Sequence, residues 1–406
     1  MSKVIVTILA GGKGERLYPL TRDRAKPAVP FGGIYRIIDF ALSNCVNSSL
    51  RKIFILTQYK SFSLTRHVNL GWNIFSTDLY EYIDVIPPQK RISEEWYRGT
   101  ADAVYQNIYN IREENPDYVI ILSGDHIYKM NYREMLDYHI SKNAEATVAA
   151  IEMGIDKCSE FGVLEIEEDY KIINFEEKPK KCKPLPFSEN ECFMSMGIYI
   201  FNTNTLFKAL EDDSLTDTHH DFGKDIIPKL VREKKNIFAY NFKDENKKKA
   251  KYWRDVGTID AYWEANMDLI SVDPQFNLYD PTWPLHTYQL QCPPAKFVFA
   301  QESSEGGRRG IALDSIVSSG SIISGGKVQN SILSNNVRIN SFSEITDSIL
   351  LEGVVVGRYS KIKKAVIDKG TVIPAGTKIG YNLEEDAKRF KITDSGIIII
   401  PRHEKI

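Results

Sequence analysis

The last quarter of the chain carries an aliphatic repeat that restricts the fold more strongly than any other feature. Three aliphatic residues follow one another six positions apart, and the set recurs every 17 residues. All twelve positions hold Ile, Leu or Val: Ile316, Ile322, Val328, Leu333, Ile339, Ile345, Leu350, Val356, Ile362, Ile367, Ile373 and Ile379. Such a period describes a coil of three short strands, in which each inward side chain stacks on its counterpart in the next coil. The repeat predicts a β-helix of about four coils.

Coils of this kind also occur in acyltransferases, many of which need a catalytic histidine there. The seven histidines of this chain are His67, His126, His139, His219, His220, His286 and His403. None falls between residues 316 and 379. We therefore interpret the β-helix as a scaffold for assembly or regulation and not as a second active site.

The first 273 residues alternate between two kinds of apolar pattern. Strand-like runs occupy residues 4–10, 52–59, 118–124, 146–153 and 195–201. Helical spacing occurs over residues 132–143, 204–213 and 221–235. This alternation predicts an α/β fold with a mostly parallel sheet covered by helices. Ligands of such sheets bind outside the carboxyl ends of the strands.

The chain of 406 residues is too long for one ordinary core. We expect a catalytic domain over residues 1–273 and a β-helix domain with a C-terminal tail over residues 311–406. The segment between them, residues 274–310, is expected to be a linker. It contains Pro274, Pro281, Pro284, Pro293 and Pro294.

Composition excludes several classes of partner. A net charge of -2 leaves no excess of Lys and Arg for a nucleic-acid backbone. No run of 18 apolar residues and no signal-peptide pattern occurs, so we expect no membrane partner. The five cysteines are odd in number, widely spaced and without a CxxC pair, which indicates neither a disulfide framework nor a zinc site. We expect a soluble protein of the reducing cytoplasm.

The glycine-rich stretch ILAGGKGERLYPLT, residues 8–21, follows the first strand-like run. It lacks the Lys-Ser/Thr pair of a P-loop, since Gly14 is followed by Glu15 and Arg16. It also lacks the third glycine of the dinucleotide fingerprint, because Leu17 stands there. A third kind of nucleotide site is therefore expected, with its glycine backbone close to phosphate.

Several further motifs carry a family resemblance. RAKPAVPFGG, IIDFALSN, WYRGTADAV, SGDHIY, FEEKP, SMGIYIF, HDFGKDIIP and YWRDVGT, together with the glycine loop, resemble the bacterial glucose-1-phosphate adenylyltransferases, or ADP-glucose pyrophosphorylases. The resemblance covers essentially the whole chain. It implies a Rossmann-like nucleotidyltransferase domain followed by a left-handed β-helix. The implied reaction joins ATP and α-D-glucose 1-phosphate to give ADP-glucose and diphosphate, for glycogen biosynthesis.

The chemistry of this reaction assigns expected roles at the nucleotide end. The backbone of Gly11, Gly12 and Gly14 would approach the triphosphate, with Arg16 and Lys26 near the leaving phosphates. Asp125, at the end of a strand, and Asp255 would converge to hold Mg²⁺, Asp125 being catalytic. The alternatives are a plain strand-to-helix turn with solvated cations, and aspartates that only cap turns or helices.

At the sugar end, Lys178 is expected to hold the phosphate of glucose 1-phosphate, and Glu177 the sugar hydroxyls. Taken alone, the EEKP stretch would be an ordinary charged strand end. The match to the family adds Tyr97, Gly162 and Ser195 to this pocket. Gln89 and Gly99 are candidate readers of the adenine, because Gln pairs with donor and acceptor edges and Gly admits a flat base.

Regulation is implied by the resemblance alone. Family members respond to phosphorylated metabolites through basic residues, and here Asp23 interrupts the pair Arg22 and Arg24. Gln58 and Trp96 match the family's link between effector and substrate sites. The resemblance also implies a homotetramer. The sequence leaves two alternatives open: a non-catalytic regulatory subunit, and a pyrophosphorylase that uses another nucleotide or sugar.

Overall fold

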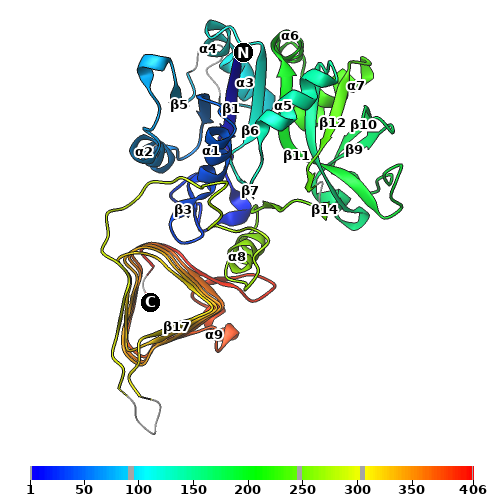
Figure 1. The fold of residues 1–406 in the computed structure, drawn as a ribbon. Helices are drawn as coiled ribbons and strands as arrows, with labels where there is room; N and C mark the ends of the chain where they lie inside the picture. Colours follow the sequence, from blue (N-terminus) through cyan, green and yellow to red (C-terminus); the bar gives the residue numbers. More distant parts are fainter. Residues whose placement is uncertain (1, 90–95, 245–248, 302–306, 405) are drawn as a thin grey trace.

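The computed structural model describes residues 2–89, 96–244, 249–301, 307–404 and 406 (Figure 1). A layered α/β part comes first in the chain, and a triangular β-helix, viewed nearly end on in Figure 1, follows it. Among the described residues, no helix combines the length and the apolar character that a membrane span needs.

A nine-stranded sheet forms the centre of the α/β part, with β1 between β4 and β6. Its strands are β1 (Val4–Ala10), β4 (Lys52–Thr57), β5 (Tyr82–Ile86), β6 (Tyr118–Ser123), β8 (Ala146–Gly154), β9 (Gly162–Ile166), β10 (Ile172–Glu177), β11 (Glu191–Asn202) and β12 (Ile237–Asn241). Only β10 and β11 run opposite to the other strands of this sheet. The predicted mostly parallel sheet is confirmed.

Helices cover both faces of the sheet because the side chains of β1 alternate between two cores. Val6, Ile8 and Ala10 pack with residues of α1 (Ile37–Asn47), α2 (Phe62–Gly71) and α5 (Tyr132–Ser141). Ile5 packs on the opposite face, whose core includes residues of α3 (Thr100–Gln106), α4 (Ile108–Glu113), α6 (Thr203–Ser214) and α7 (Ile227–Arg232). The result is a three-layer arrangement. Because β1, β4, β5 and β6 are parallel, their carboxyl ends all lie at the same edge of the sheet.

The predicted helix over residues 221–235 is shorter and less regular than its spacing suggested. It consists of one π-helical turn (Phe222–Ile226) followed by α7, which ends at Arg232. The Asp221 side chain caps this segment by accepting hydrogen bonds from the backbone of Gly223 and Lys224. The π turn places Phe222 and Gly223 at the cavity described below.

The β-helix consists of three sheets of stacked parallel strands, which give the triangular outline in Figure 1. The first sheet holds β16 (Lys296–Val298), β19 (Ile322–Ser324), β22 (Arg338–Ile339), β25 (Val355–Val356) and β28 (Val372–Ile373). The second holds β17 (Ile311–Leu313), β20 (Lys327–Gln329), β23 (Glu344–Thr346), β26 (Lys361–Lys363) and β29 (Lys378–Ile379). The third holds β18 (Ile316–Val317), β21 (Ile332–Leu333), β24 (Ile349–Leu350), β27 (Ala365–Ile367) and β31 (Ile398–Ile400), and β30 (Lys391–Ile392) pairs antiparallel with β31 at its end.

Ten of the twelve predicted inward positions, from Val328 to Ile379, are buried in one core. The first two are wrong by one residue: Val317, not Ile316, pairs with Leu333, and Ile323, not Ile322, pairs with Ile339. The corner after Ile323 is one residue shorter than its counterpart after Ile339, because Ile323 to Val328 spans five positions and Ile339 to Ile345 spans six. Gly325, at φ 73°, and Gly326 form this tight corner.

A hydrophobic core joins the β-helix to the α/β part. The outward residues Ile332, Ile349 and Val366 pack against α8 (Ile259–Asp268) and the loops around it. The indole of Trp263 also donates a hydrogen bond to the Asp347 carbonyl, at 3.0 Å. One face of the β-helix is therefore covered by the first part of the chain.

The proline-containing segment is held against α1 and α2. Thr287 donates a hydrogen bond to the buried Asp39 carboxylate, at 2.6 Å, and Trp283 donates one to Asn44, at 2.9 Å. Strand β16 pairs with β19 and so begins within the expected linker. The segment is packed, and the exact domain boundaries stay a prediction.

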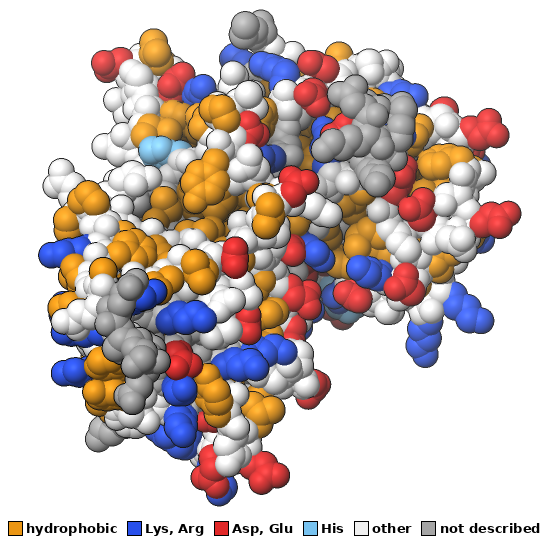
Figure 2. Space-filling model, turned by 60° about the horizontal axis from the view of Figure 1, so that its bottom comes forward, with side chains coloured by type: hydrophobic (Ala, Val, Ile, Leu, Met, Phe, Trp, Pro, Cys, Tyr) orange, Lys and Arg blue, Asp and Glu red, His pale blue; other side chains and the backbone are white. Residues whose placement is uncertain are grey.

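The surface carries no large area of one charge in the view of Figure 2, where acidic and basic side chains are interspersed. Hydrophobic side chains gather toward the left of that face.

Candidate active site

A cavity of about 560 Å³ opens at the carboxyl ends of β1, β4 and β6. Twelve of the sixteen predicted site residues line it: Gly11, Gly12, Arg16, Gln58, Tyr97, Gly99, Asp125, Gly162, Glu177, Lys178, Ser195 and Asp255. This is the edge at which a parallel sheet binds ligands. The structure therefore gathers most of the predicted residues around one space.

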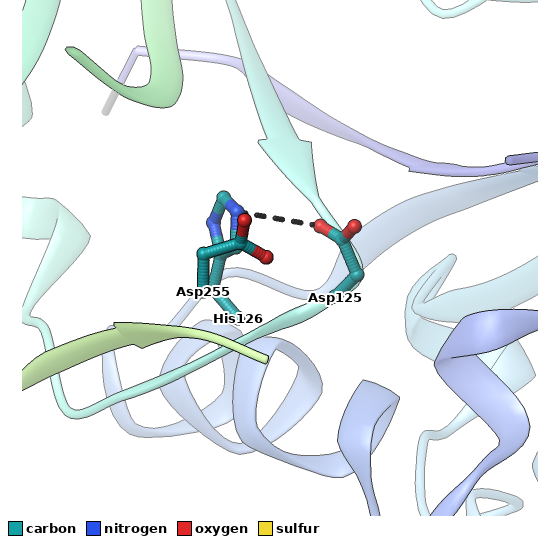
Figure 3. Close-up of side chains that lie close together, drawn as sticks. All are labelled: Asp125, His126 and Asp255. Carbon is teal, nitrogen blue, oxygen red and sulfur yellow. Dashed lines mark ion pairs between the residues drawn. The ribbon is translucent and has the colours of Figure 1, made fainter. Parts of the chain in front are cut away.

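Two carboxylates from distant parts of the chain meet in this cavity (Figure 3). Asp125 follows β6, and Asp255 ends β15 (Trp253–Asp255). Strand β15 pairs antiparallel with β7 (His126–Tyr128), which places Asp255 opposite His126. Ligand atoms of Asp125, His126 and Asp255 all lie within 4.8 Å of one another. The predicted convergence of the two aspartates is present in the structure.

Lys26 lies beneath the two carboxylates, and it is not among the residues that line the cavity. Its Nζ atom is 2.7 Å from Asp125 Oδ2 and 2.9 Å from Asp255 Oδ1, and the side chain is 9% exposed. Burial alone would lower the pKa of Lys26, but the two carboxylates raise it, so the lysine stays charged. In this geometry Lys26 holds the two aspartates together.

The pKa of Asp125 lies well below its ordinary value. Burial would raise this pKa, but the Lys26 ammonium and the hydrogen bonds from Lys26 and Ser123 outweigh burial. Arg16 lies on the solvent side, with Nη2 3.8 Å from Asp255 Oδ2 and 66% of its side chain exposed. Arg16 is therefore free to reach a ligand in the cavity, whereas Lys26 is already bound.

The carboxylate cluster fits a hard divalent cation. Lys26 offsets one negative charge and bonds Asp125 Oδ2 and Asp255 Oδ1, whereas Asp125 Oδ1 accepts a hydrogen bond from Ser123 and Asp255 Oδ2 lies 3.8 Å from Arg16 Nη2. Such a cation is usually bound through one or two protein carboxylates, and water and phosphate oxygens supply its other ligands. His126, which the sequence analysis did not assign, has Nε2 3.5 Å from Asp125 Oδ1 and packs its ring against Trp253.

The three loop glycines differ in what surrounds them. A Cβ atom at Gly12 would meet nothing within 4 Å, whereas one at Gly11 would lie 3.1 Å from Gln58 Cβ. Gly14 has φ 65°, and a Cβ there would lie 3.0 Å from Thr21 and Lys26 atoms. Gly14 is thus needed for the turn, and it is not among the cavity residues.

The other end of the cavity carries Glu177 and Lys178. Burial, followed by the nearby Asp221 charge, raises the pKa of Glu177. The backbone of Lys178 has φ 52°, a conformation that residues other than Gly rarely adopt. The Lys178 N–H donates a hydrogen bond to the Phe161 carbonyl at 3.0 Å. The chain thus holds Lys178 in a strained conformation beside the cavity.

Close approaches explain two of the predicted glycines. A Cβ at Gly162 would lie 2.8 Å from Glu177 Oε2, and one at Gly99 would lie 2.3 Å from the carbonyl oxygens of His219 and His220. Gly99 is therefore required by backbone packing, which is a different reason from room for a flat base. Tyr97, next in this wall, has its hydroxyl bound by Asn107 at 3.0 Å.

Two predicted residues lie apart from this cavity. Gln89 lies in another hollow beside Tyr82 and Asn110, and its amide bonds to the Pro87 carbonyl at 2.8 Å. Trp96 is 61% exposed. Gln58 does line the cavity, and its amide points to the Tyr97 carbonyl at 3.5 Å. Adenine recognition by Gln89 and communication through Trp96 stay predictions.

The sequence analysis missed several residues that line the cavity. Examples are Thr100, Asp221, Phe222, Gly223 and Trp253. The Thr100 hydroxyl donates to Asp221 Oδ2 at 2.9 Å, which joins α3 to the segment before α7. All but Thr100 lie in two quoted motifs, HDFGKDIIP and YWRDVGT, and Thr100 lies in WYRGTADAV. Within those motifs, these residues differ from their neighbours only in that the fold places them at the cavity.

Comparison with known proteins covers the whole chain. The model of the nucleotidyl transferase family matches residues 5–272, and that of the GlmU-like C-terminal hexapeptide matches residues 293–400. A glucose-1-phosphate adenylyltransferase of Rhodopirellula baltica is 54% identical over 100% of this chain and 91% of its own length. Those of Koribacter versatilis and Methylococcus capsulatus are 55% and 51% identical, over 99% and 98% of this chain and 96% and 93% of their own lengths. The chain belongs to the glucose-1-phosphate adenylyltransferase family.

Proposed function

We propose that this chain transfers the adenylyl group of ATP to α-D-glucose 1-phosphate, giving ADP-glucose and diphosphate for glycogen biosynthesis. The observation that carries the proposal is the cavity itself. The glycine loop and Arg16 lie at one end, Glu177 and Lys178 at the other, and the two aspartates border the same space. The attacking phosphate and the α-phosphate would meet between these ends.

At the nucleotide end, we assign Gly11 and Gly12 to the triphosphate, because neither glycine carries a Cβ that would keep a phosphate away from its backbone. Arg16, largely exposed beside Asp255, neutralises the departing diphosphate. Lys26 keeps Asp125 and Asp255 in place through its two short ion pairs. Catalysis then rests on positioning and charge neutralisation.

We assign Mg²⁺ to Asp125 and Asp255. When bound, it would neutralise phosphate charge and orient the α-phosphate for attack. The low pKa of Asp125 keeps this carboxylate ionised throughout the neutral range. Ser123 supports it by donating a hydrogen bond to Asp125 Oδ1.

At the sugar end, Lys178 binds the phosphate of glucose 1-phosphate, and Glu177 accepts hydrogen bonds from sugar hydroxyls. Tyr97, Gly162 and Ser195 complete the wall of this pocket. The aspartate at 221 lies beside Glu177, so the pocket presents two carboxylates to a polyhydroxylated ring.

The test is diphosphate release by the purified chain alone. ATP, GTP, CTP and UTP are each combined with the 1-phosphates of glucose, mannose and N-acetylglucosamine, in the presence of Mg²⁺. We expect ATP with glucose 1-phosphate to be the best pair. Greater activity with UTP or GTP would support the related pyrophosphorylase instead, and no activity without a second chain would support the regulatory subunit. The charged residues Arg16, Lys26, Asp125, Lys178 and Asp255 oppose the latter, because a degenerate subunit would not keep them.

Regulation and assembly are part of the proposal. We assign a phosphorylated-metabolite effector and communication through Gln58 and Trp96. We propose a homotetramer, supported by hydrophobic side chains exposed on α2 and in the segment that follows it along the chain, namely Phe62, Leu70, Ile74, Leu79 and Tyr80. We also propose residues 1–273 as the catalytic domain, residues 311–406 as the β-helix domain, and a cytoplasmic location.

A further inference from the structure

His220 is a buried histidine that stands directly before the segment lining the sugar end of the cavity. Its side chain is 2% exposed, and its Nδ1 atom lies 2.7 Å from Asp213 Oδ2, near the end of α6. Because a carboxylate only accepts hydrogen bonds, Nδ1 is the donor. The Thr218 hydroxyl donates to the other oxygen of Asp213 at 2.8 Å. His220 itself is not among the described residues that line the cavity.

The backbone of His220 holds the beginning of α3. Its carbonyl accepts hydrogen bonds from the N–H groups of Ala101, at 2.8 Å, and Asp102, at 3.2 Å. A Cβ at Gly99 would lie 2.3 Å from the same carbonyl oxygen, so the two segments are in tight contact. Gly99 and Thr100 line the cavity. The position of His220 therefore sets the position of one cavity wall.

The residue after His220 is Asp221, whose carboxylate borders the cavity beside Glu177. Asp221 Oδ2 accepts a hydrogen bond from the Thr100 hydroxyl at 2.9 Å, and Oδ1 accepts one from the Gly223 N–H at 2.9 Å. These bonds need residues 99–102 and 220–223 to keep their mutual position. A shift of His220 relative to α3 would therefore displace the Asp221 carboxylate.

The backbone conformation of His220 depends on the bonds around it. Its φ is 52°, in the left-handed region that residues other than Gly seldom adopt. The Asp213 bond ties the imidazole to α6, and the His220 N–H donates to the Thr218 hydroxyl at 3.2 Å. Without the Asp213 bond, the backbone should relax toward a commoner conformation and carry residues 221–223 with it.

We propose that His220 is a positioning residue for the sugar pocket, and that it acts through Asp221. The Asp213 bond anchors the imidazole to α6, and the backbone of His220 transmits this anchor to Asp221 and to α3. This role rests on the proposed function of the sugar end, where two carboxylates, Glu177 and Asp221, face the sugar hydroxyls. The histidine itself contacts neither substrate.

The first test is kinetic. His220→Ala removes the imidazole and leaves the buried Asp213 without this partner. Displacement of a binding group by about 1 Å weakens its action by up to roughly a hundredfold. We expect the KM for glucose 1-phosphate to rise about tenfold, and the KM for ATP and kcat to change by less than about twofold. Equal rises in both KM values, or no rise in either, would overturn the proposal.

Two further substitutions separate the side-chain bond from the backbone conformation. His220→Asn keeps a nitrogen donor near the position of Nδ1, and Asn tolerates a positive φ, so its KM for glucose 1-phosphate should stay close to that of the unmodified chain. His220→Gly permits the same φ but offers no donor to Asp213, so it should behave like His220→Ala. A normal KM in the Gly variant, or a raised KM in the Asn variant, would show that the Asp213 bond does not position the pocket.

A double-mutant cycle tests the route through Asp221. Asp221→Ala removes the carboxylate and should itself raise the KM for glucose 1-phosphate. Adding His220→Ala should raise that KM no further, because the group that His220 positions is already absent. If the two effects multiply instead, His220 does not act through Asp221.

His67→Ala is the matched control. His67 is also buried and paired with a carboxylate, with Nε2 2.6 Å from Asp39 Oδ1. It lies on α2, and the described residues that line the cavity include none from that helix. Loss of a buried pair should lower the melting temperature of both variants, but only His220→Ala should raise the KM for glucose 1-phosphate. A similar rise in His67→Ala would assign the effect to general loss of stability and overturn the proposal.

Hydrogen exchange of the full chain without substrate gives a readout that does not depend on the reaction. The N–H groups that bond to the His220 carbonyl and to the Asp221 carboxylate should exchange faster in His220→Ala than in the unmodified chain. They should not do so in His67→Ala, and unchanged exchange in His220→Ala would overturn the positioning role. If the unmodified chain prefers another sugar 1-phosphate, the proposed function fails, while the exchange rates and the KM for the preferred sugar still decide the role of His220.

Discussion

The β-helix and the cavity of the α/β part are built from contacts of very different sequence separation. In the β-helix each strand pairs with the strand one coil away, for example Val328 with Ile345 and Ile345 with Ile362. Beside the cavity, the buried Lys26 contacts Asp125 and Asp255, which are 99 and 229 residues away. A repeat recurring along the chain describes the first region, whereas the second depends on the whole sheet.

The two regions also use their polar groups differently. Serines at the corners of the coils bond to nearby backbone: Ser331 accepts from Ser348 N at 3.1 Å, and Ser348 accepts from Ala365 N at 3.2 Å. At the cavity, the buried Lys26 instead pairs with two aspartates that border the open space. The comparison indicates that these serines join successive coils, whereas the ion pairs hold charged groups beside a space large enough for a ligand.

The largest effect is expected inside the β-helix. Ile323→Asp would place an unpaired charge in the aliphatic stack and should lower the free energy of unfolding by about 4–5 kcal/mol. Ile322→Asp, one residue away, is the matched control, because Ile322 is only partly buried and pairs with Arg338. Thermal and denaturant unfolding measure both. Equal losses in the two variants would show that the corrected register is wrong.

The next effect concerns catalysis. Asp125→Asn keeps the shape of the side chain but removes a charge that holds the cation, so kcat should fall on the order of a thousandfold. The melting temperature should change far less than in Ile323→Asp. Asp78→Asn, at an exposed position outside the cavity, serves as the control. Near-normal kcat at saturating Mg²⁺ would reduce Asp125 to a turn residue after β6.

A smaller effect is expected at the sugar end. Lys178→Ala removes a charged contact worth about 1.5–3 kcal/mol, so the KM for glucose 1-phosphate should rise roughly ten- to a hundredfold. The KM for ATP should change little, and kcat should fall less than in Asp125→Asn. Lys180→Ala, two residues farther along and exposed, should resemble the unmodified chain. Similar changes in both KM values would argue against a separate sugar-phosphate end.

The smallest effect separates packing from ligand approach among the glycines. Gly99→Ala brings a Cβ within 2.3 Å of two carbonyl oxygens and should cost about 1–3 kcal/mol of unfolding free energy. Gly12→Ala meets nothing within 4 Å and should leave that free energy unchanged. If the triphosphate approaches Gly12, the KM for ATP rises in this second variant. Equal stability of both variants would contradict the packing explanation for Gly99.

The amino-acid sequence by itself determined the features that repeat or follow directly along the chain. The aliphatic period identified the β-helix, and strand-like and helical spacing identified the elements around β1, β6 and α5. The motif match located Asp125, Lys178 and Asp255. The shortened corner at Gly325 and Gly326 escaped this reasoning, because aliphatic residues at both Ile322 and Ile323 satisfy the pattern.

Only the tertiary structure decided what meets across the sheet. Lys26 binds the two aspartates instead of facing the cavity, His126 lies beside Asp255, and Gly99 is required by the carbonyl groups of residues 219 and 220. The physical reason is the same in each case. A periodic pattern specifies which side of a strand faces a core, but the contacts between distant segments depend on strand order, which hydrophobic packing of the complete chain selects.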